Sequence, residues 1–306
     1  MIPFATVTLP QPYTWSLWRD LLMRVPVATT DLFVGQAWRR VLRVGEVLAL
    51  VEVTPNDADH LALHLVTANG EVDLEALQLQ VTHILNTHAT AAFFRAIPPE
   101  HRDLFMPVWG LPLVRTPDVY EALISVMIAQ QILWSTALKG IRWLLEWGGH
   151  KITYEGQHYY GFPTPSQLAA ATVDDLRPLK ITGQRMERMI LLSQRIVSGD
   201  LDLNTLETMT DYDRYLYLMA INGVGHWTAA MTLDTAFGQT VHVPDQDVGV
   251  QAAINRYIHG QAGRASASQV KTFFAPWGEQ ASAAAHAVLS RWVIENYPVR
   301  EIPATL

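Results

Sequence analysis

Three aspartates follow a glycine-rich turn in the last third of the chain: Asp234, Asp245 and Asp247. A carboxylate stabilises positive charge that develops beside it, and it can take a proton from an attacking water molecule. Asp234 falls within a predicted helix, and Asp245 follows Pro244, where it could serve a turn or a helix cap. Asp247 opens the next predicted helix, and a capping role there is compatible with a catalytic one. Asp245 and Asp247 could also form a metal pair, but no third ligand is obvious.

The turn itself contains Gly223 and Gly225, between two predicted helices, in the segment Leu218-Met-Ala-Ile-Asn-Gly-Val-Gly-His-Trp-Thr-Ala229. One interpretation is a helix-terminal glycine in an ordinary turn, which any helical protein can have. The other is a helix-hairpin-helix, in which the backbone at the two glycines approaches a DNA phosphate. The amides of Gly223, Gly225 and Thr228 would then bind that phosphate at a helix N-terminus. Such binding needs no lysine or arginine, so an acidic chain can use it.

The composition of the whole chain excludes several classes of protein and of metal site. The chain has 306 residues, a net charge of −7, 49% hydrophobic residues and no cysteine. These values exclude a disordered chain, disulfides, thiolate zinc sites and cysteine-ligated iron–sulfur clusters. No apolar run is long enough to span a membrane and no secretory signal is visible, so we expect a cytoplasmic protein. Residues 139–197 carry eight bases against five acids, so a polyanion could still meet a locally basic face.

Two hydrophobic patterns divide the chain. Strand-like runs at 36–43, 47–54 and 61–67 lie between helical stretches at 15–22 and 74–86, and Asn69-Gly70 is a hairpin-type turn signal. From Asp118 onward, helical spacing predominates, with predicted helices near 118–133, 135–147, 166–171, 184–197, 211–220, 226–237, 248–257, 268–275 and 279–296. We therefore expect an α+β fold. Its N-terminal domain, at 1–112, would hold an antiparallel sheet with helices on one face, and 113–306 would be helical.

Several segments of the chain are similar to the helix-hairpin-helix DNA glycosylase superfamily, and within it to the bacterial DNA-3-methyladenine glycosylase II family. The matching segments run nearly end to end: Pro12-Tyr13-Thr14-Trp15-Ser16, Ile128-Ala-Gln-Gln-Ile-Leu133, Leu179-Lys-Ile-Thr-Gly-Gln-Arg185, the hairpin at about 211–237, Val241-His-Val-Pro-Asp-Gln-Asp-Val-Gly-Val250, and Pro276-Trp277. Two positions depart from the family pattern, Ala129 where glycine is usual and Asn222 where proline is usual. The resemblance implies an N-terminal α+β domain followed by two all-α subdomains that contain the hairpin.

The resemblance also implies an activity. The enzyme would flip an alkylated base such as 3-methyladenine out of double-stranded DNA and hydrolyse its glycosidic bond, acting as a monomer without a required cofactor. Asp247 aligns with the catalytic aspartate of the family. Trp227 stands where glycosylases that also cut the DNA backbone carry an amine nucleophile, so the resemblance implies a monofunctional enzyme that leaves an abasic site. The alternatives are a non-catalytic hairpin protein that recognises DNA structure, and a bifunctional glycosylase/lyase for oxidised bases, which Trp227 disfavours.

Four side chains are expected to form the base pocket. Trp227 and Trp277 would stack on the flipped base, because aromatic faces bind the positive charge of alkylated purines. Met231, one helical turn after Trp227, and Tyr13 would line the same pocket, with Trp15 as a further candidate. Tryptophan is otherwise a common core residue, and ten tryptophans cannot all be functional.

The remaining candidates would contact DNA or a cation. Gln131 corresponds to the residue that the family inserts into the gap left by the flipped base, with Ile132 and Leu133 as alternatives. Arg185, at the start of a predicted helix, could hold a phosphate. The resemblance further implies a sodium or potassium ion held by three hairpin carbonyls, those of Met219, Ile221 and Val224.

Overall fold

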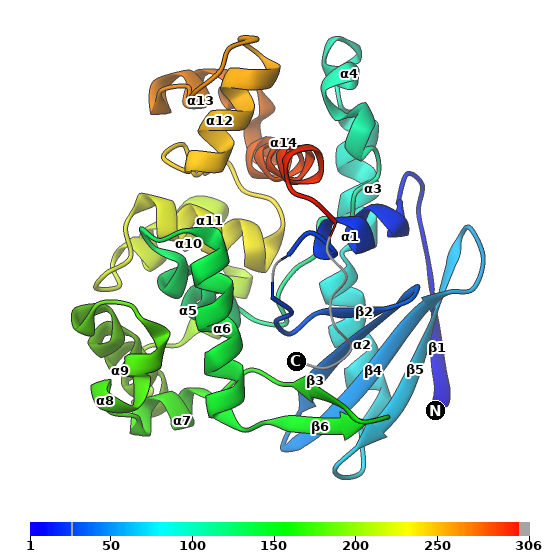
Figure 1. Cartoon of the computed structure of the whole chain (residues 1–306), viewed down its shortest axis with the longest axis vertical. Coiled ribbons are helices and arrows are strands. Elements are labelled where there is room, and N and C mark those ends of the chain that lie inside the picture. Colours follow the sequence, from blue (N-terminus) through cyan, green and yellow to red (C-terminus); the bar gives the residue numbers. More distant parts are fainter. Residues whose placement is uncertain (26, 300–306) are drawn as a thin grey trace.

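A five-stranded antiparallel sheet forms the N-terminal part of the computed structural model, which describes residues 1–25 and 27–299 (Figure 1). Its order is β1-β5-β4-β3-β2, with β1 (Ile2–Thr8), β2 (Leu32–Val34), β3 (Ala37–Val44), β4 (Val47–Pro55) and β5 (His60–Ala68). One face packs against α1 (Trp15–Leu22) and α2 (Leu74–Leu85), where Trp18, Trp38 and Leu77 share a core with Leu61 and Leu63. The predicted N-terminal antiparallel sheet is therefore confirmed.

Several local features differ from the expectation. β1, which pairs with β5, and β2, which pairs with β3, were not predicted, nor was the helix at Thr87–Ala96. Asn69-Gly70 is not a hairpin turn, because the chain passes from β5 into α2, which is capped by Asp73. Asn69 instead closes the end of the sheet, since its Oδ1 accepts a hydrogen bond from Leu48 N at 2.8 Å and its N–H donates to Leu48 O at 3.1 Å.

A second, two-stranded sheet covers part of the other face. The strands β6 (Lys151–Tyr154) and β7 (Gln157–Tyr160) form a hairpin that the sequence analysis also missed. Ile152 and Tyr159 pack on Val41, Leu48 and Leu50 of the large sheet. This hairpin therefore fixes the helical part of the chain against the N-terminal sheet.

The other elements are helical. They are α3 (Thr87–Ala96), η1 (Pro99–His101), α4 (Arg102–Phe105), η2 (Met106–Val108), α5 (Val119–Ala129), α6 (Trp134–Gly148), α7 (Pro165–Ala170), α8 (Val173–Leu176), η3 (Arg177–Leu179), α9 (Gly183–Ser198), η4 (Leu203–Thr208), α10 (Asp211–Met219), α11 (His226–Phe237), α12 (Val248–Tyr257), α13 (Ala267–Phe274), η5 (Ala275–Gln280) and α14 (Ala281–Asn296). None of these helices is long and apolar enough to cross a membrane.

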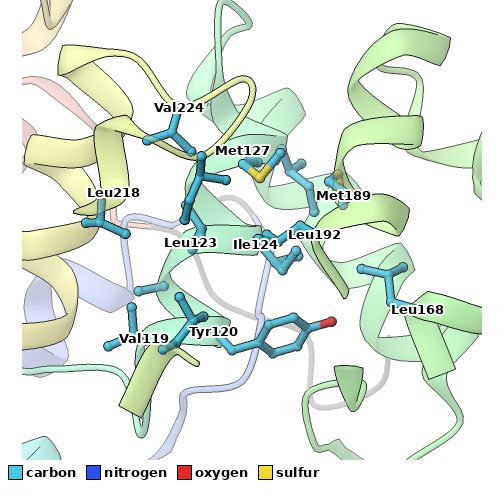
Figure 2. Packing of buried hydrophobic residues seen from close by; sticks show 14 of the residues in the cluster. Val119, Tyr120, Leu123, Ile124, Met127, Leu168, Met189, Leu192, Leu218 and Val224 are labelled. Atoms are coloured by element: carbon cyan, nitrogen blue, oxygen red, sulfur yellow. The ribbon is translucent and has the colours of Figure 1, made fainter. Parts of the chain in front are cut away.

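The first helical core surrounds α5. Figure 2 shows Leu123 and Met127 of α5 between Val224 of the hairpin on one side and Met189 of α9 on the other. Residues from α5 to α11 share this core, including the fully buried Leu218 at the end of α10. The hairpin is thus anchored on a helix that is buried along most of its length.

The second helical core lies around α12, α13 and α14. Phe93, Phe105 and other apolar residues of 93–113 pack there with Phe274 and Val288. The sequence-based division at residue 112 placed that segment with the N-terminal sheet. The position of the domain boundary stays a prediction, but the apolar residues of 93–113 pack against the C-terminal helices.

Candidate active site

The loop between α10 and α11 contains both glycines, and their conformations differ. Gly223 has φ 88°, in the left-handed region that favours glycine, and a Cβ there would lie 2.6 Å from Arg188 Cδ. Gly225 has φ −99° and ψ −178°, an extended conformation that any residue adopts. A Cβ at Gly225 would meet nothing within 4 Å. The backbone therefore favours glycine at Gly223, whereas Gly225 leaves open space before α11.

Unpaired amides face that space. Gly225 is the N-cap of α11 and supplies no side-chain hydrogen bond, and the amides of His226, Trp227 and Thr228 have no acceptor within the described part of the chain. The first N–H groups of a helix lack intrahelical partners, and the helix dipole adds partial positive charge there. The hairpin therefore presents an arrangement that suits a phosphate.

Gln130, just after α5, holds this hairpin in place. Its Nε2 donates to Gly223 O at 2.9 Å and to Thr228 Oγ1 at 2.8 Å. Thr228 is buried, so its side chain braces the turn while its amide stays at the helix start. Gln131 was predicted to contact DNA and Gln130 was not selected, although a Gln-Gln pair at the end of a predicted helix indicates that either side chain could have a functional contact.

Two arginines of α9 lie beside the hairpin. Arg185 is buried and its Nη1 donates to Ile128 O at 3.4 Å, while burial and then the neighbouring Arg188 lower the pKa of its guanidinium. Arg188 is partly exposed, packs on Gly223 and has no ion-pair partner among residues 1–25 and 27–299. The structure thus places Arg185 inside the fold and Arg188, which the sequence analysis did not single out, at its surface.

The connection from α5 to α6 carries the candidates for insertion into DNA. Gln131 is exposed and has φ 55°, a left-handed conformation that is uncommon outside glycine. Leu133, the N-cap of α6, is 76% exposed, whereas Ile132 is half-buried. A leucine as exposed as Leu133, close to the left-handed backbone of Gln131, is unusual unless the side chain contacts a binding partner.

Asp247 is the N-cap of α12, and its two carboxylate oxygens have different partners. Oδ1 accepts hydrogen bonds from Gly249 N at 2.8 Å and Val250 N at 3.0 Å. Oδ2 accepts one from the indole Nε1 of Trp227 at 3.1 Å. The cap and the indole therefore fix the orientation of a partly exposed carboxylate. The structure thus brings together Asp247 and Trp227, two residues that the sequence analysis selected separately.

The other two acids are internal. Asp245 is 1% exposed, and its carboxylate lies 3.1 Å from His226 Nε2 and 3.0 Å from Lys271 Nζ. Asp234 is 8% exposed and its Oδ2 lies 3.0 Å from His286 Nδ1. No group of three or more His, Cys, Asp or Glu side chains that could hold a metal ion occurs in the part of the chain that the structure describes.

The four predicted pocket residues separate into two pairs. Met231 is partly exposed on the same face of α11 as Trp227, and both therefore lie near Asp247. Trp277 packs on Phe105, with ring centroids 5.3 Å apart, and on Phe93 in the second helical core. Tyr13 is buried, its hydroxyl donates to Leu85 O at 2.9 Å, and burial raises the pKa of its phenol.

Trp15, the further candidate for the base pocket, also lies in a core. It is buried against Trp18 and Phe33, and its indole donates to Gln36 O at 3.0 Å.

A cavity of about 300 Å³ lies on the Asp245 side of the loop that leads to α12. It is lined by His226, Val241, His242, Val243, Lys271, Phe274, Ala275, Gly278 and Ala281. His242 stacks on Tyr215 with ring centroids 3.9 Å apart, and Tyr215 also hydrogen-bonds His226 Nδ1 at 2.9 Å. Because Asp247 and Trp227 do not line this cavity, it is separate from the site that they form.

Comparison with known proteins gives a consistent result. The family profile described as HhH-GPD superfamily base excision DNA repair protein matches residues 124–279. A DNA-3-methyladenine glycosylase of Bacillus subtilis (strain 168) is 26% identical over 248 residues, which cover 78% of this chain and 81% of that protein.

Two solved structures resemble nearly the whole chain. The 3-methyladenine DNA-glycosylase from Archaeoglobus fulgidus has a TM-score of 0.77 at 21% identity, covering 95% of this chain and 98% of that one. The 8-oxoguanine glycosylase/lyase of Clostridium acetobutylicum in its apo-form has a TM-score of 0.68 at 18% identity, covering 92% and 93%. At these identities the two likenesses show a common fold.

Proposed function

Because the chain belongs to the HhH-GPD superfamily of base excision DNA repair proteins, we propose that it is a monofunctional DNA glycosylase that excises alkylated bases such as 3-methyladenine. The observation that carries the proposal is the carboxylate of Asp247, fixed by the α12 cap and the Trp227 indole next to the hairpin. The Bacillus subtilis relative, whose name is DNA-3-methyladenine glycosylase, supports the substrate class.

The chemistry of base excision gives Asp247 and Trp227 different roles. When the bond between C1′ of the deoxyribose and the base nitrogen breaks, its electron pair leaves with the base and positive charge develops on the sugar. Asp247 stabilises that charge and takes a proton from the water molecule whose oxygen adds to C1′. Trp227 orients the carboxylate through its N–H and offers its ring face to the flipped base. An alkylated purine already carries positive charge, so it leaves as a neutral base without an acid catalyst.

The lack of an amine at Trp227 supports a hydrolytic enzyme. A lyase forms a Schiff base between an amine and the sugar, and an indole cannot do so. The Clostridium acetobutylicum protein, named a glycosylase/lyase, has the same fold. A shared fold does not determine which nucleophile an enzyme uses, so this likeness does not favour a lyase.

We expect double-stranded DNA to bind across the hairpin. The amides of Gly223, Gly225 and Thr228 would hold one phosphate, and Arg188 would add a cation that the buried Arg185 cannot supply. Gln131 or Leu133 would enter the gap left by the flipped base. We propose that the protein acts as a monomer in the cytoplasm. Trp277, which is partly exposed, would stack on the flipped base together with Trp227, and the buried Tyr13 would support the pocket from the core beside the sheet.

The hairpin backbone also suits a monovalent cation. Ile221 O accepts a hydrogen bond from Val224 N at 3.0 Å, and the carbonyls of Met219 and Val224 accept none within the described residues. A carbonyl has two lone pairs, so all three oxygens could ligate sodium or potassium. Such an ion would steady the turn and favour the phosphate beside it; no other cofactor is proposed. We further infer that the two helical cores correspond to two all-α subdomains.

The proposal is tested with purified protein and duplex DNA treated with a methylating agent. We expect release of methylated purines and abasic sites that break only after alkali or heat. Borohydride added during turnover should trap no protein–DNA adduct. A borohydride-dependent adduct would show an amine at the sugar and would contradict the hydrolytic mechanism. Binding without any base release would support the alternative of a non-catalytic protein.

A further inference from the structure

Three contacts connect α11, the start of α12 and α14 into one ring of residues. Trp227 of α11 donates to Asp247 at 3.1 Å. Gly249 packs against Leu289 of α14 so closely that a Cβ on the glycine would lie 2.6 Å from Leu289 Cδ1. His286, also on α14, returns to α11 through Asp234 at 3.0 Å. Trp227 and Asp234 are seven residues apart on α11, about 10 Å along the helix axis, a separation comparable to the length of a purine.

Several side chains of this ring are partly exposed to solvent. Between residues 281 and 290 of α14, His286 and Leu289 are the two positions that are not buried, and they lie one turn apart. On α11, Trp227 and Met231 are likewise partly exposed, and helical spacing places Asp234 on the same face. The His286 side chain is 29% exposed, although α14 is otherwise enclosed in this segment. The imidazole therefore lies on the same accessible side as Asp247 and Trp227.

The contact with Asp234 occupies one nitrogen of the His286 imidazole and leaves the other available for a further hydrogen bond. Nδ1 faces Asp234 Oδ2, and Nε2 has no hydrogen-bond partner among the described residues. Burial lowers the pKa of His286, but the charge of Asp234 and its hydrogen bond outweigh burial, so the pKa is raised above its usual value. The other charged or titratable groups on the packed elements are His226 on α11, Asp247 and Arg256 at the two ends of α12, Arg291 and Glu295 near the end of α14, and Arg115, which lies against Gly238 after α11. A protonated His286 would present an N–H at Nε2.

We propose that His286 is a second catalytic residue, which protonates uncharged purine lesions such as hypoxanthine as they leave the sugar. The proposal rests on the proposed function and widens its substrate class. The proton moves from Nε2 to a ring nitrogen of the flipped base, the C1′–N9 bond breaks and its electron pair goes to the base. Water oxygen adds to C1′, and the water proton passes to Asp247. Cationic lesions gain nothing from His286, because they leave neutral without an added proton.

The test compares two lesions in otherwise identical duplexes under single-turnover conditions, one with hypoxanthine and one with cationic 7-methylguanine. Wild-type excision of hypoxanthine should fall as the pH rises from about 5 to 9, because His286 loses its proton. His286→Gln should lower the hypoxanthine rate by about 10²–10⁴ and remove this pH dependence, with 7-methylguanine excision unchanged. Asp234→Asn should move the fall in rate to lower pH. His60→Gln is the matched control, since His60 also pairs with an aspartate, Asp57, but on the exposed end of the sheet.

Each other outcome overturns the proposal. If His286→Gln lowers both rates equally, its role is structural, and the melting temperature of the variant will show whether the fold has changed. If Asp234→Asn leaves the hypoxanthine pH profile where it was, the titrating group is not His286. If the wild type excises 7-methylguanine and not hypoxanthine at any pH, this inference fails while the proposed function stands. Failure to excise 7-methylguanine as well would contradict the proposed function.

Discussion

The two carboxylate oxygens of Asp247 have different partners, an arrangement that suits the helix cap and the catalytic role that we propose. Oδ1 closes the N-terminus of α12, while Oδ2 takes the Trp227 hydrogen bond and stays near the accessible face of α11. Asp245 and Asp234, the other candidates, are buried carboxylates that lie next to basic side chains. The candidate site therefore contains one carboxylate that is oriented without being neutralised by a neighbouring cation.

At the same scale, the two hairpin glycines should respond differently to substitution. Gly225→Asp should weaken binding to an abasic-site duplex, because a carboxylate would enter the open space before α11 and repel a phosphate. Its melting temperature should stay near that of the wild type, since the backbone there is extended.

Gly223→Ala is the comparison variant, and it should destabilise the fold by about 1–3 kcal/mol through its left-handed backbone. Fluorescence anisotropy and thermal unfolding measure the two effects. Unchanged affinity in Gly225→Asp would place the phosphate elsewhere, with Arg188 the first alternative.

At the scale of elements, the main helices from α5 onward were predictable because apolar spacing and caps agree, whereas α3 and α4 were not predicted. Asp118, for example, accepts a hydrogen bond from Glu121 N at the start of α5, as its position before an apolar run suggests. β6 and β7 were missed because each has four residues and their turn is Glu155-Gly156 rather than Asn-Gly, although both turn residues have positive φ. β1 contains Pro3, which lowers its strand signal, and it becomes a strand through pairing with the distant β5.

The site was predictable only in part. Asp247 and Trp227 could be selected from the resemblance, but a sequence does not say which tryptophan faces a core. Tyr13 has the residue type of a pocket residue but is buried in the core beside the sheet, whereas Trp277 packs against the second helical core with its side chain partly exposed. The Asp234–His286 contact joins helices 52 positions apart in the chain, so spacing alone could not reveal it.

The contact between α11 and α14 should make stability depend on pH. The folded-state pKa of His286 is raised, because Asp234 outweighs burial. The contact therefore stabilises the fold fully below the unfolded pKa of about 6.5, and this contribution is lost as the pH rises through the folded pKa.

Urea unfolding of the wild type and His286→Gln should show a stability difference that is largest near pH 6 and shrinks toward pH 9. A stability difference that grows with pH would contradict the raised pKa of His286 and therefore its pairing with Asp234.

At the scale of the whole molecule, the resemblance inferred from the sequence is confirmed. The family profile covers the hairpin, most of the first helical core and part of the second, and the likeness to the Archaeoglobus fulgidus structure extends over 95% of the chain. The N-terminal sheet is therefore part of the shared architecture. The β6–β7 hairpin packs on this sheet and so connects the helical part of the chain to it.

The acidic whole chain should bind DNA with a shallow salt dependence. Its net charge is −7, and the hairpin offers amides rather than cations. Since each neutralised phosphate adds about 0.9 to the slope of log K against log salt, Arg188→Ala should reduce that slope by about 1. Arg177→Ala is the control, because Arg177 is exposed and already pairs with Asp174. An equal effect of both substitutions would mean that Arg188 has no specific phosphate.

The most direct test of the account is the single-turnover rate of Asp247→Asn on methylated DNA, beside Asp245→Asn. Asparagine also caps helices, so Asp247→Asn should keep the fold and the affinity for DNA while base excision falls by about 10²–10³. Asp245→Asn removes a buried partner of His226 and Lys271, so it should lower stability and keep most of the activity. A near-normal rate for Asp247→Asn together with an inactive, folded Asp245→Asn would contradict the account and transfer the catalytic role to Asp245.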